Sequence, residues 1–360
     1  MLKKTLYTIG FIIIAIALYL TLWPVAIDPV AWQSPHNPGY TGVFARNERL
    51  KGVEMLPIGE NHGPEDVAID AKGNIYGSTH EGNIVRLKPD GSNPENWVNT
   101  GGRPLGIDFD NNGNLIVADA YRGLLSISQN GTITELAKEA DGIPILYADD
   151  VDVASDGNIY FSDASTKFDA KKYKGTYKAS LLDLMEHGGH GRLLVFDIKK
   201  GKARTLLKGI NFANGVAVSH DQNYVLVNET GSYRVIRYWI KGDKKGKSDI
   251  FIDELPAFPD NISTGLNSNF WVALVSPRNS FLDKLSDKPF IRKMIQRLPA
   301  FIRPKAKPYG HVISIDKDGN VIKDLQDPSG SYPINSSVIE TEDYLYIGSL
   351  VAPAIGRFPS

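Results

Sequence analysis

A short unit of alternating apolar residues, a polar turn and a second β-rich segment recurs along the chain, and one position in each copy concentrates residues that can do chemistry. The clear copies start their first strand at Val67, Ile107 and Val151, and weaker copies start at Val216, Ile262 and Val338. The position two residues before each start reads Glu65, Leu105, Asp149, Asn214, Asp260 and Ser336. Repeats made of strands and turns are typical of a β-propeller, in which equivalent positions of the innermost strands form a ring around the axis. The pattern therefore predicts that four side chains direct oxygen atoms at one place: Glu65, Asp149, Asn214 and Asp260.

Three carboxylates and one amide are the hard oxygen ligands that calcium, magnesium and manganese prefer. Calcium takes about six to eight oxygens, so water or a substrate would complete the shell, and Asn261 is a further candidate ligand. Like charges that converge on a channel repel one another unless a cation lies between them. We therefore expect a divalent cation here, with calcium as the first choice. The alternative is that these residues cap turns, as Asp and Asn often do, but their recurrence at one register favours the metal site.

Two histidines fall on the same face of the predicted propeller as the ring. His62 lies three residues before Glu65, and His80 ends the second strand of the first repeat. Either side chain could act as a general acid or base near neutral pH. Each is also explained as an ordinary surface histidine, so they are candidates for the wall of a substrate pocket.

The repeats predict an all-β fold, a six-bladed β-propeller over residues 50–360 with four strands in each blade. The last repeat lacks a fourth strand, while Val53–Ile58 precedes the first repeat without a partner, and pairing the two would remove an open sheet edge. Two insertions, about 166–190 and 277–309, fall between the second and third strands of their blades. Both contain helix-like stretches, Ala179–Glu186 and Phe281–Ile302. Because strand direction alternates, both insertions lie on the face that holds the ring, where we expect them to form a cap; loop variation without a role is the alternative.

The N-terminus carries a candidate membrane anchor. Residues 5–23 are apolar and nearly uncharged, and they follow Lys3 and Lys4. A helix of this length spans about 28 Å, enough for a hydrocarbon core. We expect residues 1–23 to be an uncleaved signal anchor with a cytoplasmic N-terminus, which places the propeller on the periplasmic, extracytoplasmic or lumenal side. A cleaved signal peptide is the alternative, but Trp23–Asp28 offers no small-residue cleavage site.

Between anchor and propeller, residues 24–49 contain four prolines and few periodic apolar positions, which is typical of a stalk. Residues 278–307 hold nine basic and two acidic side chains interleaved with apolar ones. A basic amphipathic helix of this kind can lie on a membrane surface, or its apolar side can pack on the propeller. The sequence leaves both possibilities open.

Composition narrows the classes of function. The formal net charge is −1, so nucleic acid is not an expected partner, because phosphate binding needs a strong basic excess. The chain has no cysteine, which excludes disulfides, thiolate catalysis and zinc–thiolate sites. No nucleophile elbow, phosphate loop or dinucleotide fingerprint is found in the sequence.

Several segments together resemble the strictosidine synthase-like proteins, a family with N-terminally anchored members. They are Gly63-Pro-Glu-Asp66, Gly102-Arg-Pro-Leu-Gly106, Ala118-Asp-Ala-Tyr-Arg-Gly-Leu124, Ile159-Tyr-Phe-Ser-Asp163, Phe212-Ala-Asn-Gly215, Arg237-Tyr-Trp-Ile240, Phe258-Pro-Asp-Asn261 and Leu345-Tyr-Ile-Gly-Ser349. The resemblance runs in order from about residue 50 to the end of the chain. It implies a six-bladed propeller of the superfamily that includes paraoxonase and the senescence-marker/gluconolactonase proteins, in which an axial divalent ion activates esters and lactones.

The resemblance also implies roles for individual residues. The metal ligands of those relatives fall on Glu65, Asp149 (usually Asn there), Asn214 and Asp260. The catalytic glutamate of the alkaloid-forming enzyme falls at Ser336, which argues against Pictet–Spengler condensation. The paraoxonase histidine pair falls near Leu105 and Ala120, so that proton relay is absent too.

What remains resembles the gluconolactonase arrangement, in which a metal-bound aspartate serves as base. The leading expectation is a membrane-anchored, calcium- or other divalent-metal-dependent hydrolase of a small-molecule ester or lactone. Asp260 is the expected base, and His62, His80 and Tyr121 are expected to shape the pocket. The alternative is a non-catalytic binding module whose calcium is structural, which the missing base and histidine pair favour.

Overall fold

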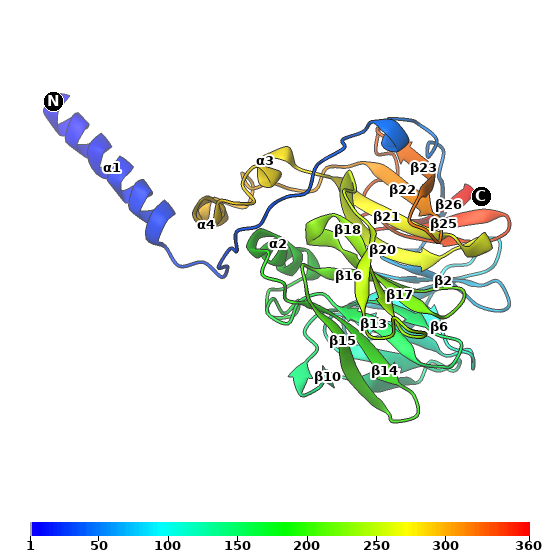
Figure 1. Cartoon of the computed structure of the whole chain (residues 1–360). Coiled ribbons are helices and arrows are strands. Elements are labelled where there is room, and N and C mark those ends of the chain that lie inside the picture. Colours follow the sequence, from blue (N-terminus) through cyan, green and yellow to red (C-terminus); the bar gives the residue numbers. More distant parts are fainter. Residues whose placement is uncertain (1) are drawn as a thin grey trace.

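Six antiparallel sheets of four strands each are found within residues 2–360, the part of the chain that this computed structural model describes (Figure 1). The innermost strand of each sheet contacts the innermost strands of its two neighbours, so the sheets close into a ring. The predicted six-bladed propeller is therefore confirmed.

The first three blades follow the chain in simple order. Blade 1 is β2 (Val67–Ile69), β3 (Ile75–Ser78), β4 (Asn83–Leu87) and β5 (Glu95–Asn99). Blade 2 is β6 (Pro104–Phe109), β7 (Leu115–Asp119), β8 (Gly123–Ile127) and β9 (Ile133–Ala137). Blade 3 is β12 (Ala148–Val153), β13 (Ile159–Asp163), β14 (Gly191–Asp197) and β15 (Lys202–Ile210), and a small hairpin of β10 (Glu139–Ala140) and β11 (Ile143–Pro144) precedes it.

The remaining blades complete the ring. Blade 4 is β16 (Ala213–Val218), β17 (Tyr224–Glu229), β18 (Arg234–Trp239) and β19 (Ser248–Ile252). Blade 5 is β20 (Ala257–Thr264), β21 (Phe270–Pro277), β22 (Gly310–Ile315) and β23 (Val321–Asp327). Blade 6 is β24 (Asn335–Glu340), β25 (Tyr344–Ser349), β26 (Ala354–Pro359) and the N-terminal β1 (Glu54–Pro57). Short 3₁₀ turns occur at Gly42–Phe44, Thr230–Ser232 and Leu266–Ser268.

Blade 6 joins the two ends of the propeller, because β1 pairs antiparallel with β26. Glu54 lies opposite Arg357, and their side chains form an ion pair with 2.9 Å between Oε2 and Nε. Leu56, opposite Ile355, is buried in the apolar cluster between blades 6 and 1. Pairing of β1 thus removes the sheet edge that the last repeat leaves open.

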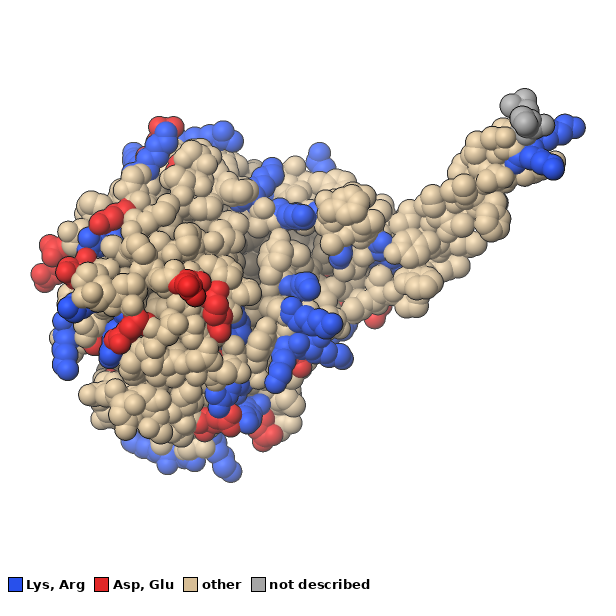
Figure 2. Space-filling view, turned by 180° about the vertical axis from the view of Figure 1, so that it is seen from behind, with Lys and Arg blue, Asp and Glu red and all other residues tan. Residues whose placement is uncertain are grey.

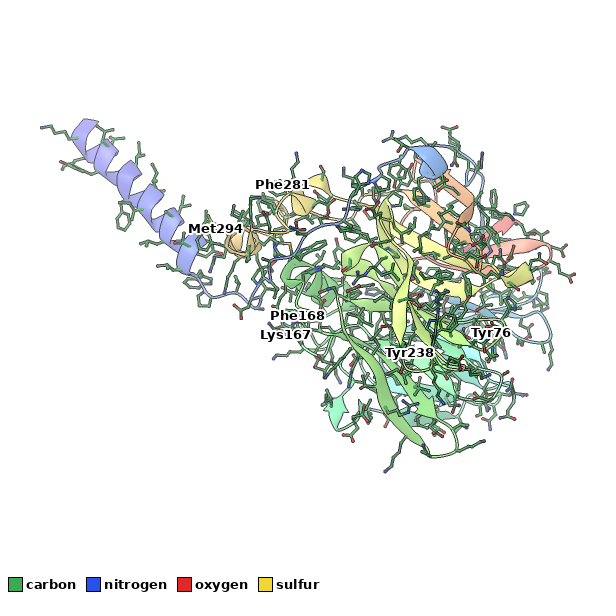
Figure 3. The ribbon with its side chains drawn as sticks, in the orientation of Figure 1. Tyr76, Lys167, Phe168, Tyr238, Phe281 and Met294 are labelled. Carbon is green, nitrogen blue, oxygen red and sulfur yellow. The ribbon has the colours of Figure 1, made fainter. Side chains whose placement is uncertain are left out.

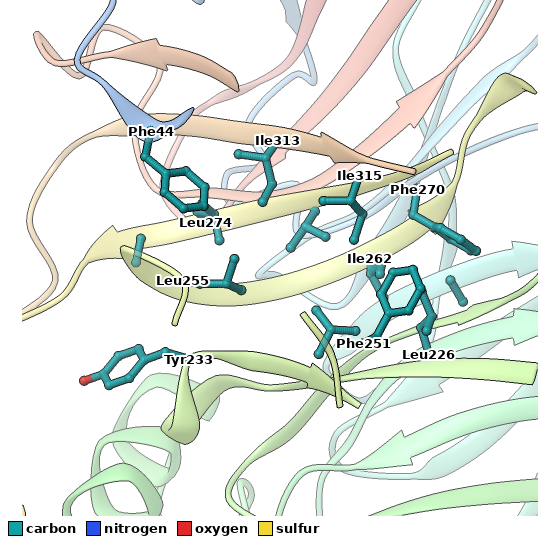
Figure 4. Packing of buried hydrophobic residues seen from close by; sticks show 14 of the residues in the cluster. Phe44, Leu226, Tyr233, Phe251, Leu255, Ile262, Phe270, Leu274, Ile313 and Ile315 are labelled. Carbon is teal, nitrogen blue, oxygen red and sulfur yellow. The ribbon is translucent and has the colours of Figure 1, made fainter. Parts of the chain in front are cut away.

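Apolar side chains from facing sheets fill the spaces between blades. Between blades 4 and 5, for example, Leu226 and Phe251 pack against Ile262 and Phe270 (Figure 4). Phe44, from the segment that precedes the propeller, joins the same cluster. The alternation of apolar residues along each strand therefore serves two interfaces, because both faces of a propeller sheet are covered.

Helix α1 (Leu2–Leu22) projects from the propeller on the side that carries the insertions (Figure 1). It is long and apolar enough to cross a membrane, with a mean hydropathy of 2.2 within Lys3–Leu22, and no residue of that apolar stretch is buried. Helix α2 (Thr176–Glu186) lies in the first insertion, and α3 (Ser280–Asp283) and α4 (Pro289–Arg297) lie in the second. Helix α2 packs against α4, and α4 packs against α1.

The segment predicted as a stalk has little regular structure, but it lies along the propeller rather than standing free of it (Figure 1). Ile27 is fully buried, and Val30 and Trp32 donate backbone hydrogen bonds to Glu186 and Ser286 in the two insertions. We call residues 24–36 the strap. The strap runs between the insertions and connects α1 directly to the cap.

Truncation of Leu56 tests the closure of blade 6. Leu56→Ala should destabilise the protein by about 2–4 kcal/mol, because it leaves a cavity at the joint between the chain ends. Met55→Ala is the matched control, since the neighbouring side chain is 46% exposed and should change stability by less than about 0.5 kcal/mol. Thermal unfolding of the detergent-solubilised full chain measures both; equal effects would contradict the role of β1 in closure.

Candidate metal centre

A β-bulge at each innermost strand of blades 2 to 6 aims the ring positions. In β12, for example, Ala148 pairs with Asp163 and Val151 with Phe161, so three steps on one strand match two on the other. The same shift occurs in β6, β16, β20 and β24, in each case across the ring position and the residue after it. A bulge bends the strand and turns side chains out of the regular alternation. Two consecutive residues can therefore point to different places, one toward the axis and one toward the next blade.

The four predicted ligands come together at the axis as buried side chains from four blades. Glu65, Asp149, Asn214 and Asp260 are each no more than 7% exposed. Asn214 Nδ2 donates to Asp260 Oδ1 at 2.6 Å, and Asn261 Nδ2 donates to Glu65 Oε1 at 3.0 Å. One oxygen on each ligand nevertheless has no hydrogen-bond partner: Glu65 Oε2, Asp149 Oδ2, Asn214 Oδ1 and Asp260 Oδ2.

Burial raises the pKa of all three ring carboxyls, and repulsion from neighbouring carboxylates adds to it at Glu65 and Asp149. For Glu65 and Asp149, burial is the main cause of a pKa well above the usual range, and the Asp260 charge adds to it. Burial raises the pKa of Asp260 to about 7, although the Asn214 amide opposes that rise. The site is therefore short of positive charge, and a cation between these oxygens would reverse the effect.

Buried aspartates one residue further along the chain tie the blades together. Asp66 Oδ2 accepts the Ile107 N–H of blade 2 at 2.8 Å, and Asp150 Oδ2 accepts the Val216 N–H of blade 4 at 2.7 Å. A side chain at Gly106 or Gly215 would collide with the facing blade, since a Cβ there would lie 2.3 Å from Asp150 Oδ1 or Ile262 N. These contacts between neighbouring blades hold the backbone next to the ring positions in place and so orient the ring side chains.

The donor set fits a divalent cation. Hard, buried and unpaired oxygens are what calcium or magnesium requires, and an orphaned buried carboxylate oxygen is otherwise unfavourable. Within residues 2–360, no three His, Asp or Glu side chains are already gathered at a spacing that would hold a metal ion by themselves. The fit therefore depends on amide oxygens as well as carboxylates. Asn228, which the repeat pattern does not reveal, adds another unpaired Oδ1 while its Nδ2 donates to the Asp260 carbonyl at 2.6 Å.

The two other ring positions do not offer ligands. Leu105 is buried in an apolar cluster with Ile27, Tyr147 and Phe212. Ser336 Oγ donates to the Glu65 backbone carbonyl at 2.6 Å and so joins blade 6 to blade 1. Neither position therefore places a titratable side chain in the ring.

We call the face of the propeller that carries the two insertions its mouth. A layer of apolar side chains and buried arginines, here called the roof, covers this face above the ring. The apolar part contains Ile27 of the strap and Phe168, Ala179 and Leu182 of the first insertion, beside Leu105 of the ring. Three arginines of the second insertion donate side-chain hydrogen bonds to backbone carbonyls of residues 20–36. Arg278 donates to the carbonyls of Pro35 and His36, Arg292 to that of Val30, and Arg297 to those of Leu20 and Trp23.

The predicted pocket residues lie around the mouth, at its edge. The rings of His62 and His80 stack with centroids 4.9 Å apart, and His62 pairs with Glu81. Burial and the nearby Arg103 lower the pKa of His80. Tyr121 packs against the roof and lines an adjoining cavity of about 400 Å³.

Arg103, like Asn228, is a residue of this region that the repeat pattern does not reveal. It is 3% exposed; its Nη1 donates to the Thr79 and Pro104 carbonyls, while its Nε has no partner. Burial lowers its pKa and Glu65 opposes that change, which places a fixed positive charge beside the ring. The signal available in the sequence is its position two residues before Leu105.

The fold and the ring define a class of protein: a six-bladed propeller with a buried set of candidate oxygen ligands at its axis, beneath a cap formed by two insertions.

The family model described as strictosidine synthase matches residues 149–243, and that described as strictosidine synthase-like, N-terminal, matches residues 42–87. The chain is 39% identical over 313 residues to protein strictosidine synthase-like 6 of Arabidopsis thaliana, covering 84% of this chain and 81% of the relative. It is 33% identical over 354 residues to the adipocyte plasma membrane-associated protein of Rattus norvegicus, covering 92% of each. The chain belongs to the strictosidine synthase-like family.

Solved structures of lower sequence similarity share the fold. A gluconolactonase from Xanthomonas campestris superimposes with a TM-score of 0.63 at 16% identity, covering 94% of this chain and 99% of that one. A calcium-binding protein, regucalcin, from Agrobacterium tumefaciens gives a TM-score of 0.55 at 16% identity, covering 82% and 85%. These similarities show the propeller architecture.

The buried carboxyls predict a pH dependence of stability that calcium should remove. Asp260 has a folded-state pKa of about 7 against an ordinary value of 3.8, so the folded chain keeps a proton that the unfolded chain releases in between. Stability without metal should therefore fall as pH rises from about 4 to about 7. Unfolding temperatures at pH 5 and pH 8, with chelator or with calcium, measure this. Equal pH slopes in both conditions would contradict a cation among these carboxylates.

Proposed function

We propose that this protein is a membrane-anchored, divalent-metal-dependent hydrolase of small-molecule esters or lactones, with calcium as the first candidate metal. The observation that carries the proposal is the set of four buried, unpaired oxygens directed at one axis. The gluconolactonase and regucalcin neighbours support it, because they have the same architecture and their names describe a lactonase and a calcium-binding protein.

Glu65, Asp149, Asn214 and Asp260 would hold the cation. When bound, it would supply a positive charge that polarises the substrate carbonyl and stabilises the negative charge developing on its oxygen. Asp260 takes a proton from the attacking water, whose oxygen forms a bond to the carbonyl carbon. The bond from that carbon to the ester or ring oxygen then breaks, and Asp260 returns the proton to the departing alcohol. The hydrogen bond from Asn214 Nδ2 to Asp260 Oδ1 fixes the orientation of that carboxyl.

Arg103 is placed to orient the substrate. Its guanidinium is held by two backbone carbonyls and carries a charge that the protein only partly neutralises. An arginine fixed in this way can hold a substrate oxygen in one position without reorganising. His80 and Tyr121, both near Arg103, would form the polar wall of the approach.

Substitution of Asp260 by its isostere tests the chemistry. Asp260→Asn keeps an oxygen that can accept the Asn214 hydrogen bond but cannot take a proton, so hydrolysis of aryl esters and lactones should fall at least about 100-fold. Asp318→Asn, an exposed aspartate, is the control and should retain activity. Turnover that survives both Asp260→Asn and chelation would refute the proposal.

A non-catalytic module with a structural calcium is the second candidate. It is favoured by the roof and by the lining of the cavities, since no ring residue lines the cavity beside Tyr121 or a second one, of about 340 Å³, beside Trp32, His187 and Asn211. In that case calcium would raise the unfolding temperature, while a broad ester and lactone screen would show no turnover. The Asp260→Asn experiment and the metal-dependent unfolding experiment together distinguish the two functions.

We further propose that α1 crosses the membrane with its N-terminus in the cytoplasm and that the second insertion rests on the opposite surface. Arg297 binds the carbonyls of Leu20 and Trp23, and Tyr19 Oη donates to the Arg297 carbonyl at 3.0 Å, so α4 lies beside the last turn of α1. Tyr and Trp favour the membrane–water interface.

Helix α4 buries basic side chains and exposes apolar ones, the opposite of an ordinary surface helix. Arg292 and Arg297 are buried, while Phe290 is 58% exposed and Ile291 is 40% exposed. Phe281 and Met294 lie on the side of the cap near α1 (Figure 3). Exposed apolar side chains next to a membrane-spanning helix favour contact with lipid.

Single cysteines test this topology, because the natural chain has none. With an impermeant maleimide on intact cells, Lys199→Cys on the far face of the propeller should react, and Lys3→Cys should react only after permeabilisation. Phe290→Cys should react slowly in membranes and rapidly in detergent, because lipid covers it. The reverse pattern at Lys3 and Lys199 would contradict the orientation, and equal rates at Phe290 would contradict lipid contact.

A further inference from the structure

The first insertion carries a group of exposed lysines that the hydrolase proposal does not use. Lys171, Lys172, Lys174 and Lys178 are all exposed, and within residues 2–360 none of them forms an ion pair with Asp or Glu. Only Asp169 is acidic between residues 167 and 178. We call these four residues the lysine cluster.

The wall of a cavity next to the lysine cluster also carries a net positive charge. It measures about 400 Å³ and is lined by Gly101, Tyr121, Arg122, Glu135, Lys138, Ile145 and Lys171. Its single carboxylate, Glu135, is shared by Arg122 and Lys138, with nitrogen–oxygen distances of 2.9 and 2.6 Å. Three cations against one anion leave the wall with an excess of positive charge. Tyr121 adds an aromatic ring with a hydroxyl group.

Both features lie close to the point where the chain leaves the membrane helix. Tyr121 and Tyr173 pack in the same apolar cluster as Val25 and Ile27, which follow α1 by only a few residues. Figure 2 shows Lys and Arg gathered on the part of the propeller next to the projecting helix. The lysine cluster therefore faces the region where lipid headgroups begin, if α1 spans a bilayer.

We propose that the lysine cluster and the adjoining cavity form a binding surface for anionic phospholipid headgroups. Lysines near a membrane surface are attracted by acidic lipids, and the attraction acts only within about one Debye length, roughly 10 Å at 0.1 M salt. A phosphate group in the cavity would meet Arg122, Lys138 and Lys171 together, and Arg suits phosphate oxygens because of its planar set of donors. This surface would fix the rotation of the propeller about α1, so the mouth would face the bilayer.

The proposal depends on α1 lying in a membrane but not on hydrolysis, so its test needs no turnover. The full chain is placed in nanodiscs of phosphatidylcholine alone or with about one third phosphatidylglycerol, and acetylation rates of individual lysines are measured by mass spectrometry. In the anionic discs, Lys171, Lys172, Lys174 and Lys178 should react at least about threefold more slowly, and 1 M salt should remove the difference. The lysines on the opposite face, Lys199, Lys241, Lys244 and Lys245, should react equally in both.

A pair of matched variants controls for indirect effects. Changing the lysine cluster to glutamine should restore rapid acetylation of Lys138 in anionic discs, whereas the same change at the four opposite-face lysines should not. Protection that is equal in neutral and anionic discs, or absent from both, would overturn the proposal. Protection of Lys138 and Lys171 by inorganic phosphate in neutral discs would also overturn it, because the ligand would then be a soluble phosphate.

Discussion

Repulsion among buried carboxylates at the axis is the constraint to which the rest of this structure responds. Glu65, Asp149 and Asp260 are all shielded from water, which raises the pKa of each carboxyl. The Asp260 charge further raises the pKa of Glu65 and of Asp149, and the Asp149 charge raises that of Glu65. Such a group of charges is tolerated only if the backbone holds it rigidly and a counter-charge is supplied. The bulges provide the rigid placement, and the aspartates that bridge neighbouring blades keep it from relaxing. The unpaired oxygens lie where a counter-charge would have to bind.

The roof covers the ring residues and separates them from the outside of the protein. It is assembled from three separate parts of the chain, and each of its buried arginines binds backbone carbonyls of residues 20–36, although Arg278 also pairs with Asp283. A carbonyl partner does not depend on the side chain at that position, so the strap can vary in sequence while the arginines still hold it. Helix α1, the strap and the cap therefore form one continuous unit above the propeller.

The sequence predicted the fold and the ring because both depend on periodicity. The alternation within strands, the polar turns and the register of Glu65, Asp149, Asn214 and Asp260 are all local patterns that repeat. Asn228 and Arg103 escaped that reasoning because they lie outside the repeated register and gain their roles only through contacts with distant strands. The strap escaped it too, since prolines and sparse apolar residues describe a segment without regular structure but do not show that Ile27 packs into a roof. Pattern identifies elements, whereas burial of an irregular segment depends on the surface that it meets.

The pairing of β1 with β26 also orders events during synthesis. Strand β1 emerges early, but its partner is the last strand of the chain, and Ser336 secures Glu65 across the same joint. Contacts so distant in sequence are slow to form, because the intervening chain must already be arranged. A chain that lacks blade 6 would hold all four candidate ligands, but blades 1 and 5 would border an open gap and the Glu65 carbonyl would lack its Ser336 partner. The blades therefore close into a ring only when β26 is available to β1, so the strand that holds no candidate ligand decides whether the ligand-bearing blades are locked together.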